Sequence, residues 1–407
     1  MKSRYNLIGI LAVMIFGVIL VACGGQGEDR PGTVSVDPKS ETVSISASGT
    51  GSGSGTGTGS ASGSVSASGT GSASASGTGS ASGSASGTSH GEVHYYEAMG
   101  GYAPVSDVGS HSLVVNDVKD INELLGADPK DFAGIRVIYD DGKHSVKSSG
   151  KVRTISGFAG SERSEPIWDD YVAYYGAGWL DTFVSAAIDG TGPFEGEADG
   201  VRKQGVQKGI QNQTMIAWAI HELVAALKKA EDGNFDPEKG APHNWDEFWA
   251  FYHGVSPSSG PFGTADKRGG NFGTGTAVND AILAQTIVGR DALVNGDVVA
   301  ARAASDEIIR QIQITYIQAS IRYASKMSSD LAGGDTEKAR IHQAEGWAFF
   351  RVIEPMIAAV DSDVAAKISS IYDLANPPTD PGTSVLDALE SVYSALGINP
   401  DEVGTLS

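Results

Sequence analysis

Cysteine is almost absent from this chain of 407 residues, because Cys23 is the only one. A single cysteine excludes an intramolecular disulfide and excludes zinc or iron–sulfur sites built from several thiolates. Basic residues are also scarce, with 29 Lys and Arg against 49 Asp and Glu and a formal net charge of −20. We therefore expect no nucleic-acid partner, because phosphate groups need lysine and arginine to displace their counterions. An acidic exterior suits solubility and the attraction of cations.

Several catalytic signatures are missing as well. The sequence holds no G-x-S-x-G elbow, no P-loop and no H-E-x-x-H motif. His221-Glu222 continues as Leu-Val-Ala, so the second histidine of a zinc protease is absent. No recognised catalytic motif remains, and we do not expect an enzyme of these classes.

Residues 1–23 have the pattern of a secretory signal. Lys2 and Arg4 precede an apolar run that ends in Leu20-Val21-Ala22-Cys23. This tetrapeptide resembles the bacterial lipobox, in which the cysteine is diacylated and becomes the mature N-terminus. A plain signal peptide or an uncleaved anchor is the alternative. Either way, we expect the bulk of the chain outside the cytoplasm, and lipidated Cys23 would attach it to the membrane at the cell surface or in the periplasm.

A low-complexity tether is predicted for residues 24–90. From Ser46 to Ser89 the chain consists of Ser, Gly, Thr and Ala, with Val65 as the one exception. Such a segment lacks the apolar surface that would offset its ordering entropy, so we expect disorder. As a flexible coil it would span roughly 35 to 40 Å and separate the folded part from the envelope. Its serines and threonines would also permit glycosylation.

The folded part, residues 91–407, is predicted to be an all-α helical bundle. Apolar residues recur at helical spacing, and Gly and Pro separate the helical segments. A polar, glycine-punctuated stretch from Asp141 to Ser164 predicts a loop or a short hairpin. The expected helices are Leu113–Leu125, Phe132–Tyr139, Trp168–Ile188, Val201–Ala230, Trp245–His253, Thr276–Val294, Val298–Ser328, Glu337–Val360, Asp363–Leu374 and Ser384–Leu396.

One stretch is especially dense in reactive side chains. His243–Gly254 reads HNWDEFWAFYHG and contains two histidines, two carboxylates and five aromatic rings. Two segments resemble it, WDDYVAYYG from Trp168 and EGWAFF from Glu345. Aligned on their aromatic residues, the three segments place acids at Asp170, Glu247 and Glu345. We therefore predict that three helices present an acid at one equivalent point.

A weak internal repeat predicts two related halves. A long helix with Ile210-Gln211 and Ala217 precedes Trp249-Ala250-Phe251-Tyr252, and a long helix with Ile312-Gln313 and Ala319 precedes Trp347-Ala348-Phe349-Phe350. Duplication would give a helical bundle of this kind. Coincidence between two helical segments is the alternative.

The predicted helix Val201–Ala230 carries a histidine and an acid in apolar surroundings. Glu222 shares a face with Met215, Trp218 and Ala219, so its carboxylate is expected in the core. Burial of an unpaired carboxylate costs several kcal/mol, so Glu222 must be protonated, paired or bound to a cation. Pairing of Glu222 with Arg or Lys, and of His221 with a carbonyl, is the alternative to metal binding.

The remaining candidates lie in the other two segments. Asp246 and His253 are seven residues apart on one predicted helical face, and Glu247 points about 100° away. His342 and Glu345 form an i,i+3 pair of the kind that binds carboxylate-bridged iron, although with the histidine first. First-turn acids that are favoured by the helix dipole are the alternative explanation for Asp246 and Glu247.

Together these residues form an oxygen-rich set with some imidazole. The predicted metal ligands are His221, Glu222, Asp246, Glu247, His253, His342, Glu345 and Asp170. Carboxylate and imidazole favour Fe(II), Fe(III) or Mn(II), and Zn(II) is less favoured without thiolates. The aromatic residues between them are expected to pack the core.

Five motifs resemble one known family, the low iron-inducible periplasmic or iron-assimilating proteins. The motifs are KGIQNQTMIAWAIHEL, APHNWDEFWAFYHG, TADKRGGNFGT, TYIQASIRYA and AEGWAFFRVIEPMI, within Val105 to Val360. The resemblance implies an extracytoplasmic protein that is produced under iron limitation and linked to iron uptake, without an established enzymatic activity. The lipobox and the long tether differ from the family's pattern, and they indicate a protein anchored at the surface rather than one free in the periplasm. The fragment His342 to Glu345 also matches the HxxE signature of imelysin-type helical proteins.

The sequence therefore predicts a tethered, all-helical protein that binds iron and supplies it to a transporter. Two alternatives remain open. One is a metal-dependent oxidase that uses the same carboxylates. The other is a structural or interaction module in which these polar residues form satisfied networks.

Overall fold

The computed structural model describes residues 93–407. The predicted signal peptide, the lipobox with Cys23 and the whole predicted tether lie outside these residues. Tyr95–Ser407 belong to one compact unit. Within the described residues there is no strand, only the isolated bridges Met99↔Tyr102 and Val146↔Val152. The predicted all-α fold class is confirmed.

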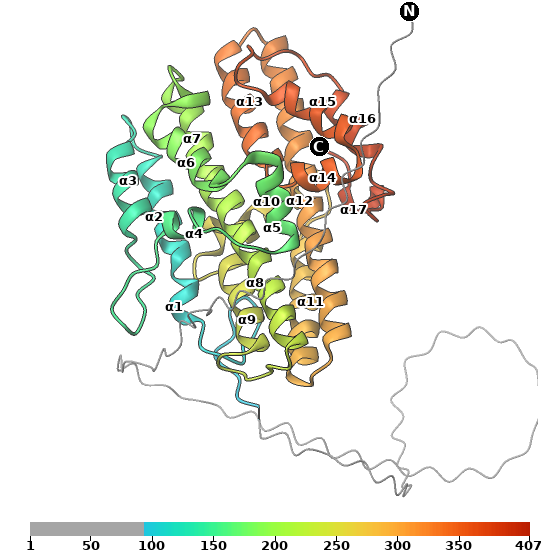
Figure 1. Ribbon diagram of the computed structural model, residues 1–407. Helices are drawn as coiled ribbons and strands as arrows, with labels where there is room; N and C mark the ends of the chain where they lie inside the picture. Colours follow the sequence, from blue (N-terminus) through green and yellow to red (C-terminus); the bar gives the residue numbers. More distant parts are fainter. Residues whose placement is uncertain (1–92) are drawn as a thin grey trace, which may run out of the picture. The chain divides into compact units, whose positions relative to one another are not determined.

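The helices follow one another through the described region with short connections (Figure 1). The first group is α1 (Gly109–Ser112), α2 (Val114–Leu124), α3 (Phe132–Asp141), α4 (Ile155–Ala159), α5 (Pro166–Tyr175), α6 (Trp179–Asp189), η1 (Gly192–Phe194), α7 (Asp199–Lys208) and η2 (Gly209–Thr214). The second group is α8 (Met215–Glu231), α9 (Ala241–Tyr252), η3 (Pro257–Ser259), α10 (Pro261–Phe272), α11 (Ala277–Val294), α12 (Val298–Ala332), α13 (Thr336–Phe350), α14 (Glu354–Val360), α15 (Ser362–Tyr372), α16 (Ser384–Glu390) and α17 (Pro400–Val403).

Two long helical runs organise the unit. The first is α7, η2 and α8, in which η2 is a π-helical segment, and the second is the 35-residue α12. Each run is followed by a shorter helix packed against it, α9 on α8 and α13 on α12. Figure 1 shows α8, α9, α11 and α12 side by side. The order of elements thus agrees with the predicted pair of halves.

Aromatic residues of α9 fill the centre of the core. Trp245 and Trp249 are completely buried. The Trp245 indole donates to the carbonyl of Thr286 at 2.8 Å, which ties α9 to α11. Gly289 makes this approach possible, because a Cβ there would lie 1.9 Å from the Trp245 ring. The aromatic residues therefore pack the core, as expected.

Two predicted helices are each divided in two. Trp168–Ile188 is broken between α5 and α6, where Gly176 and Gly178 have φ of 91° and 67°. Residues other than glycine rarely adopt such positive φ angles, and a right-handed α-helix cannot continue through a residue with such an angle. Glu337–Val360 is broken before α14, which has Pro355 in its first turn. Proline lacks the N–H that a continuous helix needs at this position.

Four α-helices were not predicted: α1, α4, α10 and α17. The stretch predicted as a loop or hairpin contains the Val146↔Val152 bridge and also α4, which Thr154 caps by accepting from the Gly157 N–H. Helix α10 begins at Pro261, which the prediction treated as a break. Proline is favoured in the first turn of a helix, since its missing N–H has no intrahelical partner there.

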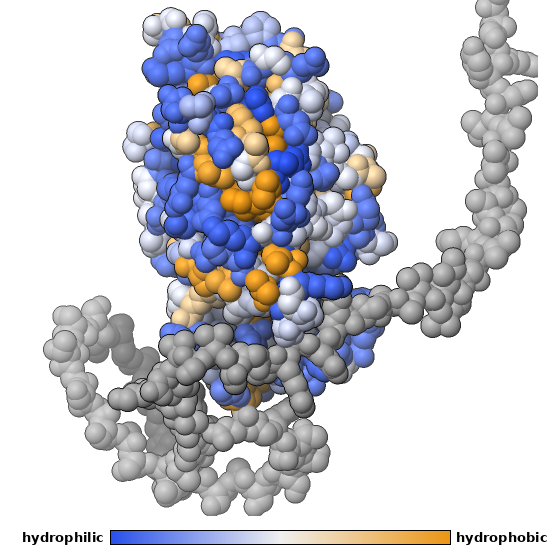
Figure 2. All heavy atoms as spheres, turned by 90° about the vertical axis from the view of Figure 1, so that its left-hand side faces the viewer, coloured by the Kyte–Doolittle hydropathy of each residue, from blue (hydrophilic) through white to orange (hydrophobic). Residues whose placement is uncertain are grey.

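The surface of the described residues is largely hydrophilic on the face shown in Figure 2, with apolar patches between the polar side chains. Among the described residues, no helix is both long enough and apolar enough to cross a membrane.

Candidate functional site

The predicted centre, His243–Gly254, forms most of α9 and the turn after it. His243 and Glu247 lie one helical turn apart, on the same face. The Nε2 atom of His243 is 2.9 Å from Oε1 of Glu247. The His243 side chain is 21% exposed and that of Glu247 is 12% exposed, so the pair lies just below the surface.

A second histidine reaches the same carboxylate from α1. The Nε2 atom of His111 is 3.1 Å from Oε1 of Glu247, and its ring lies edge-on to that of His243. The Arg153 guanidinium contacts the same nitrogen of His111. A guanidinium only donates and a carboxylate only accepts. One protonation state of this nitrogen therefore cannot match both neighbours.

Helix α8 contributes the fourth side chain, Glu222, which is only 4% exposed. One of its oxygens accepts from the Asn244 amide at 2.5 Å, and its carboxyl group is hydrogen-bonded to Glu247. We call His111, Glu222, His243 and Glu247 the His–Glu cluster. It joins three helices that lie far apart in the sequence.

The two acids of the cluster have opposite pKa shifts. Burial, followed by the negative charge of Glu247, raises the pKa of Glu222 well above its ordinary value. Burial would also raise the pKa of Glu247, but His111 and His243 outweigh it and hold that pKa below the usual range. The raised pKa of Glu222 favours its protonated form, which can donate a hydrogen bond to the carboxylate of Glu247.

The histidine on α9 responds to the same charge. Burial alone would lower the pKa of His243, but its hydrogen bond to Glu247 and the charge of that carboxylate raise it. Its Nδ1 atom is buried and has no hydrogen-bond partner among the described residues. The raised pKa favours the charged form of His243, which would balance the Glu247 carboxylate.

The spacing of the donor atoms bears on metal binding. Adjacent donors around an ion with bonds of about 2.1 Å at right angles lie roughly 3 Å apart, close to the 2.9 and 3.1 Å found here. However, no group of three or more His, Cys, Asp or Glu side chains in the described part of the chain could hold a metal ion as the structure stands. The residue types fit iron, but metal binding would require side chains to move.

Asp246, the neighbour of Glu247, faces a separate polar site. It is completely buried and accepts from Val105 N and Ser106 N at 2.9 Å, from the Ser106 hydroxyl at 2.7 Å, and from the Tyr102 hydroxyl. Burial raises its pKa to about 6, against the opposing effect of these hydrogen bonds. Asp246 therefore anchors the segment before α1 to α9.

Two other predicted ligands lie outside the cluster. His253 stacks on Trp249 at 13°, its Nδ1 atom is 2.7 Å from the Gly254 carbonyl oxygen, and burial lowers its pKa. Asp170 is an exposed residue of α5. The structure does not bring either residue to Glu247.

The remaining three predicted ligands are paired elsewhere. His221 meets Glu165 through Nδ1 at 2.9 Å, so its partner is a carboxylate rather than a metal or a carbonyl. His342 meets Asp330 at 2.5 Å, and Glu345 pairs with Lys208 at 3.1 Å. The three acids aligned by the sequence, Asp170, Glu247 and Glu345, thus lie in three different environments.

Comparison with known protein families identifies the family to which this chain belongs. The profile of the family described as low iron-inducible periplasmic protein matches residues 75–407. The chain belongs to this family. No curated protein and no solved structure matches it in these comparisons. For a low iron-inducible periplasmic protein, the imidazole and carboxylate groups of the His–Glu cluster are of the ligand types that iron accepts.

Sequence reasoning about this family member missed His111 and His243. His243 had a usable signal, because its i,i+4 spacing to Glu247 places both on one helical face. His111 had none, since only the packing of α1 against α9 brings it to the cluster. Arg153 reaches the cluster in the same way, from the segment predicted as a loop or hairpin.

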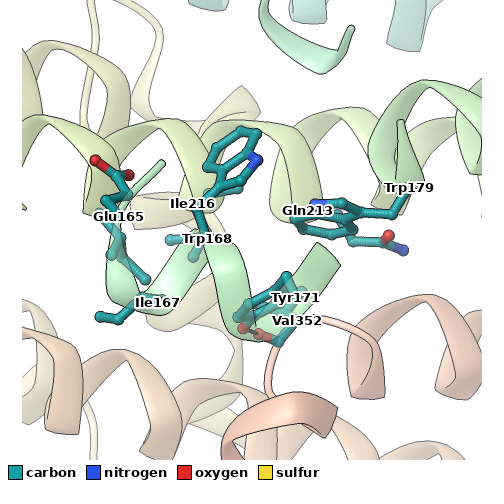
Figure 3. A pocket seen from close by; sticks show the side chains of 10 residues that line it. Glu165, Ile167, Trp168, Tyr171, Trp179, Gln213, Ile216 and Val352 are labelled. Carbon is teal, nitrogen blue, oxygen red and sulfur yellow. Dashed lines mark hydrogen bonds between the residues drawn. The ribbon is translucent and has the colours of Figure 1, made fainter. Parts of the chain in front are cut away.

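A small, partly open cavity of about 20 Å³ lies beside α5 and α8 (Figure 3). It is lined mainly by apolar groups, including Trp168, Tyr171, Trp179 and Ile216, and by Gln213 and Glu165. Such a volume holds about one water molecule. The cavity is therefore too small for an organic ligand, and it is separate from the His–Glu cluster.

Proposed function

We propose that this low iron-inducible periplasmic protein binds iron outside the cytoplasm, at the His–Glu cluster. The observation that supports the proposal is a pair of buried acids, Glu222 and Glu247, with the nitrogens of His111 and His243 3.1 and 2.9 Å from one oxygen of Glu247. Buried carboxylates are costly unless they are protonated, paired or bound to a cation. A cation bound at these acids would relieve this cost.

The donor set also favours iron over several other metals. Two imidazole nitrogens and two carboxylates suit Fe(II), Fe(III) or Mn(II), whereas Cu(I) prefers sulfur and Ca²⁺ prefers oxygen alone. The family description adds a link to low iron. Iron is thus the cargo that agrees with both the chemistry and the family.

Binding would need three local changes. Glu222 would lose its proton, Arg153 would leave Nε2 of His111, and the carboxylates would turn toward the ion. His243 is the most exposed member of the cluster, so it lies at the entrance from solvent. None of these changes requires a helix to move.

Iron titration of the purified protein tests the proposal. Glu247→Gln and His243→Ala should lower the affinity for iron at least roughly tenfold, since each removes a ligand. Glu345→Gln is the matched control, because Glu345 already pairs with Lys208. The assignment fails if Glu345→Gln lowers the affinity while Glu247→Gln leaves it unchanged. The function itself fails if the wild-type protein does not bind iron.

We propose binding rather than catalysis. An oxidase acting on Fe(II) would use the same carboxylates and would consume oxygen. An oxygen electrode should therefore record no turnover after Fe(II) is added to catalytic amounts of protein. Repeated turnover would favour the oxidase instead.

We also propose that a lipid on Cys23 holds the protein at the membrane and that iron passes from it to a transporter. The lipobox and the long tether in the sequence support the anchor. Cells that produce only Glu247→Gln protein should then take up iron as slowly as cells that lack the protein. Normal uptake by such cells would contradict the delivery step.

A further inference from the structure

A groove in a different part of the fold has the size of a ligand site. Its volume is about 540 Å³, within the roughly 300 to 1,000 Å³ that is typical of small-molecule pockets. It lies between the end of α5, helix α6 with the turn after it, and the end of α13. The residues that matter for its chemistry are Tyr175, Trp179, Thr182, Phe183, Trp347 and Arg351.

Arg351, directly after α13, is a buried basic residue that lines the groove. Its side chain is nine-tenths buried, with 8% exposed. The guanidinium carbon lies 3.9 Å from the Tyr175 ring centre, 4.6 Å from that of Phe183 and 5.6 Å from that of Trp347. Aromatic rings thus surround a buried cation.

Arg351 has no carboxylate within ion-pair distance among the described residues, 93–407. Glu354 attracts it, and burial lowers the Arg351 pKa. However, the Glu354 oxygens already accept from the hydroxyl groups of Tyr174 at 2.9 Å, Tyr175 at 2.6 Å and Ser369. A guanidinium that is buried without an ion pair is costly to keep. An anionic ligand bound in the groove would pair with the Arg351 guanidinium and offset this cost.

The arginine is held in place from the opposite side. Its Nε atom donates to Oε1 of Gln213 at 3.3 Å, and Nε2 of Gln213 donates to the Ala348 carbonyl at 2.9 Å. Gln213 belongs to the π-helical segment η2. Such segments recur at functional sites. Figure 3 shows Gln213 together with Trp179, which borders both the groove and the small cavity.

We propose that this groove binds a small organic anion with a flat ring. The carboxylate of such a ligand would pair with Arg351, and its ring would pack on Trp179 and Trp347. Asp189 also lines the groove, but it pairs with Arg136 at 2.8 Å, so Arg351 sets the sign of the charge that is recognised. The proposal does not depend on iron binding.

Calorimetric titration of the purified protein with benzoate tests the proposal. Benzoate should bind saturably, whereas benzamide, which has the same shape but no charge, should bind at least roughly tenfold more weakly. Acetate, which has the charge but no ring, should also bind more weakly. The proposal is overturned if benzoate does not bind, or if benzamide or acetate binds as tightly as benzoate does.

Two variants test the location. Thr182→Trp fills the groove from an exposed position on α6 and leaves Arg351 in place, so it should abolish benzoate binding. Arg351→Lys keeps the charge but loses the planar fork, and should weaken binding at least roughly tenfold. Val299→Trp is the control, because Val299 is 81% exposed on α12 and does not line the groove. Unchanged binding by Thr182→Trp, or equal losses in Thr182→Trp and Val299→Trp, would place the site elsewhere.

Discussion

Glu222 and Glu247 show how two identical side chains acquire different roles from their surroundings. Burial against another acid raises the pKa of Glu222, whereas the two histidines beside Glu247 lower the pKa of that carboxylate. These shifts favour a neutral hydrogen-bond donor at Glu222 and an anion at Glu247.

This difference predicts unequal effects of two matched substitutions without metal. Glu222→Gln preserves the shape and neutrality of the protonated acid, so the free energy of unfolding should change by less than about 1 kcal/mol. Glu247→Gln removes the charge that His111 and His243 face, and should cost about 2 to 3 kcal/mol. Urea denaturation at pH 7 measures both. The reverse order would contradict the assigned protonation states.

Asp246 predicts a pH dependence of stability. Its pKa is about 6 in the folded protein against a reference of 3.8. The folded state therefore binds more protons than the unfolded state between about pH 4 and 6, and this group's stabilisation is complete below pH 4 and lost as the pH rises through 6. The loss is about 3 kcal/mol for a shift of roughly two units.

Asp246→Asn isolates this effect, since asparagine does not titrate. The wild type should lose about 3 kcal/mol of this stabilisation between pH 4 and pH 7, whereas the variant should not. The free energy of unfolding of the variant should therefore rise by about 3 kcal/mol relative to that of the wild type over this range. Denaturation curves at several pH values provide the measurement. A difference that stays constant over this range would contradict the raised pKa of Asp246.

At the residue scale the sequence predicted the burial of single side chains correctly but not which side chains lie together. Helical spacing predicted that Glu222 is buried, because one face of α8 is apolar. The aromatic alignment predicted a shared site for Asp170, Glu247 and Glu345, which the structure does not show, because similar helices pack against different neighbours. Lys208, which pairs with Glu345, comes from α7, and the spacing within α13 contains no information about it.

At the scale of elements, glycine and proline explain both the correct and the wrong helix boundaries. The helical periods of α8, α11 and α12 were sufficient to predict these helices. Proline was taken as a helix end at residue 261, where it begins α10 instead. The Gly-Ala-Gly connection between α5 and α6 was missed because apolar spacing continues across it.

The close packing of α9 against α11 predicts opposite effects of alanine at two glycines, Gly289 at this contact and Gly270 away from it. Gly289→Ala should destabilise the protein by about 1 to 3 kcal/mol, because its Cβ would meet the Trp245 ring. Gly270→Ala, at an exposed position of α10 with no atom within 4 Å of the new Cβ, should stabilise by about 0.5 to 1 kcal/mol. Thermal or urea unfolding of both variants provides the measurement. Similar effects of the two would show that α9 and α11 do not pack as closely as described.

At the scale of the whole molecule, the family description indicates a periplasmic protein, and the sequence predicts an N-terminal signal with a lipidated Cys23. Cys23→Ser tests the anchor, because serine cannot be lipidated at this position. The variant should move from the membrane fraction to the soluble fraction when cells are fractionated and the protein is detected by immunoblot. Retention in the membrane fraction would favour the uncleaved apolar segment as the anchor.

The central claim is that iron binds between α1, α8 and α9. Diffraction from crystals of the iron-loaded protein, measured at the iron absorption edge, tests it most directly. We predict one anomalous peak about 2.0 to 2.2 Å from Nε2 of His243 and from a carboxylate oxygen of Glu247. A peak beside Glu345 or Asp170, or no peak after loading, would contradict the claim.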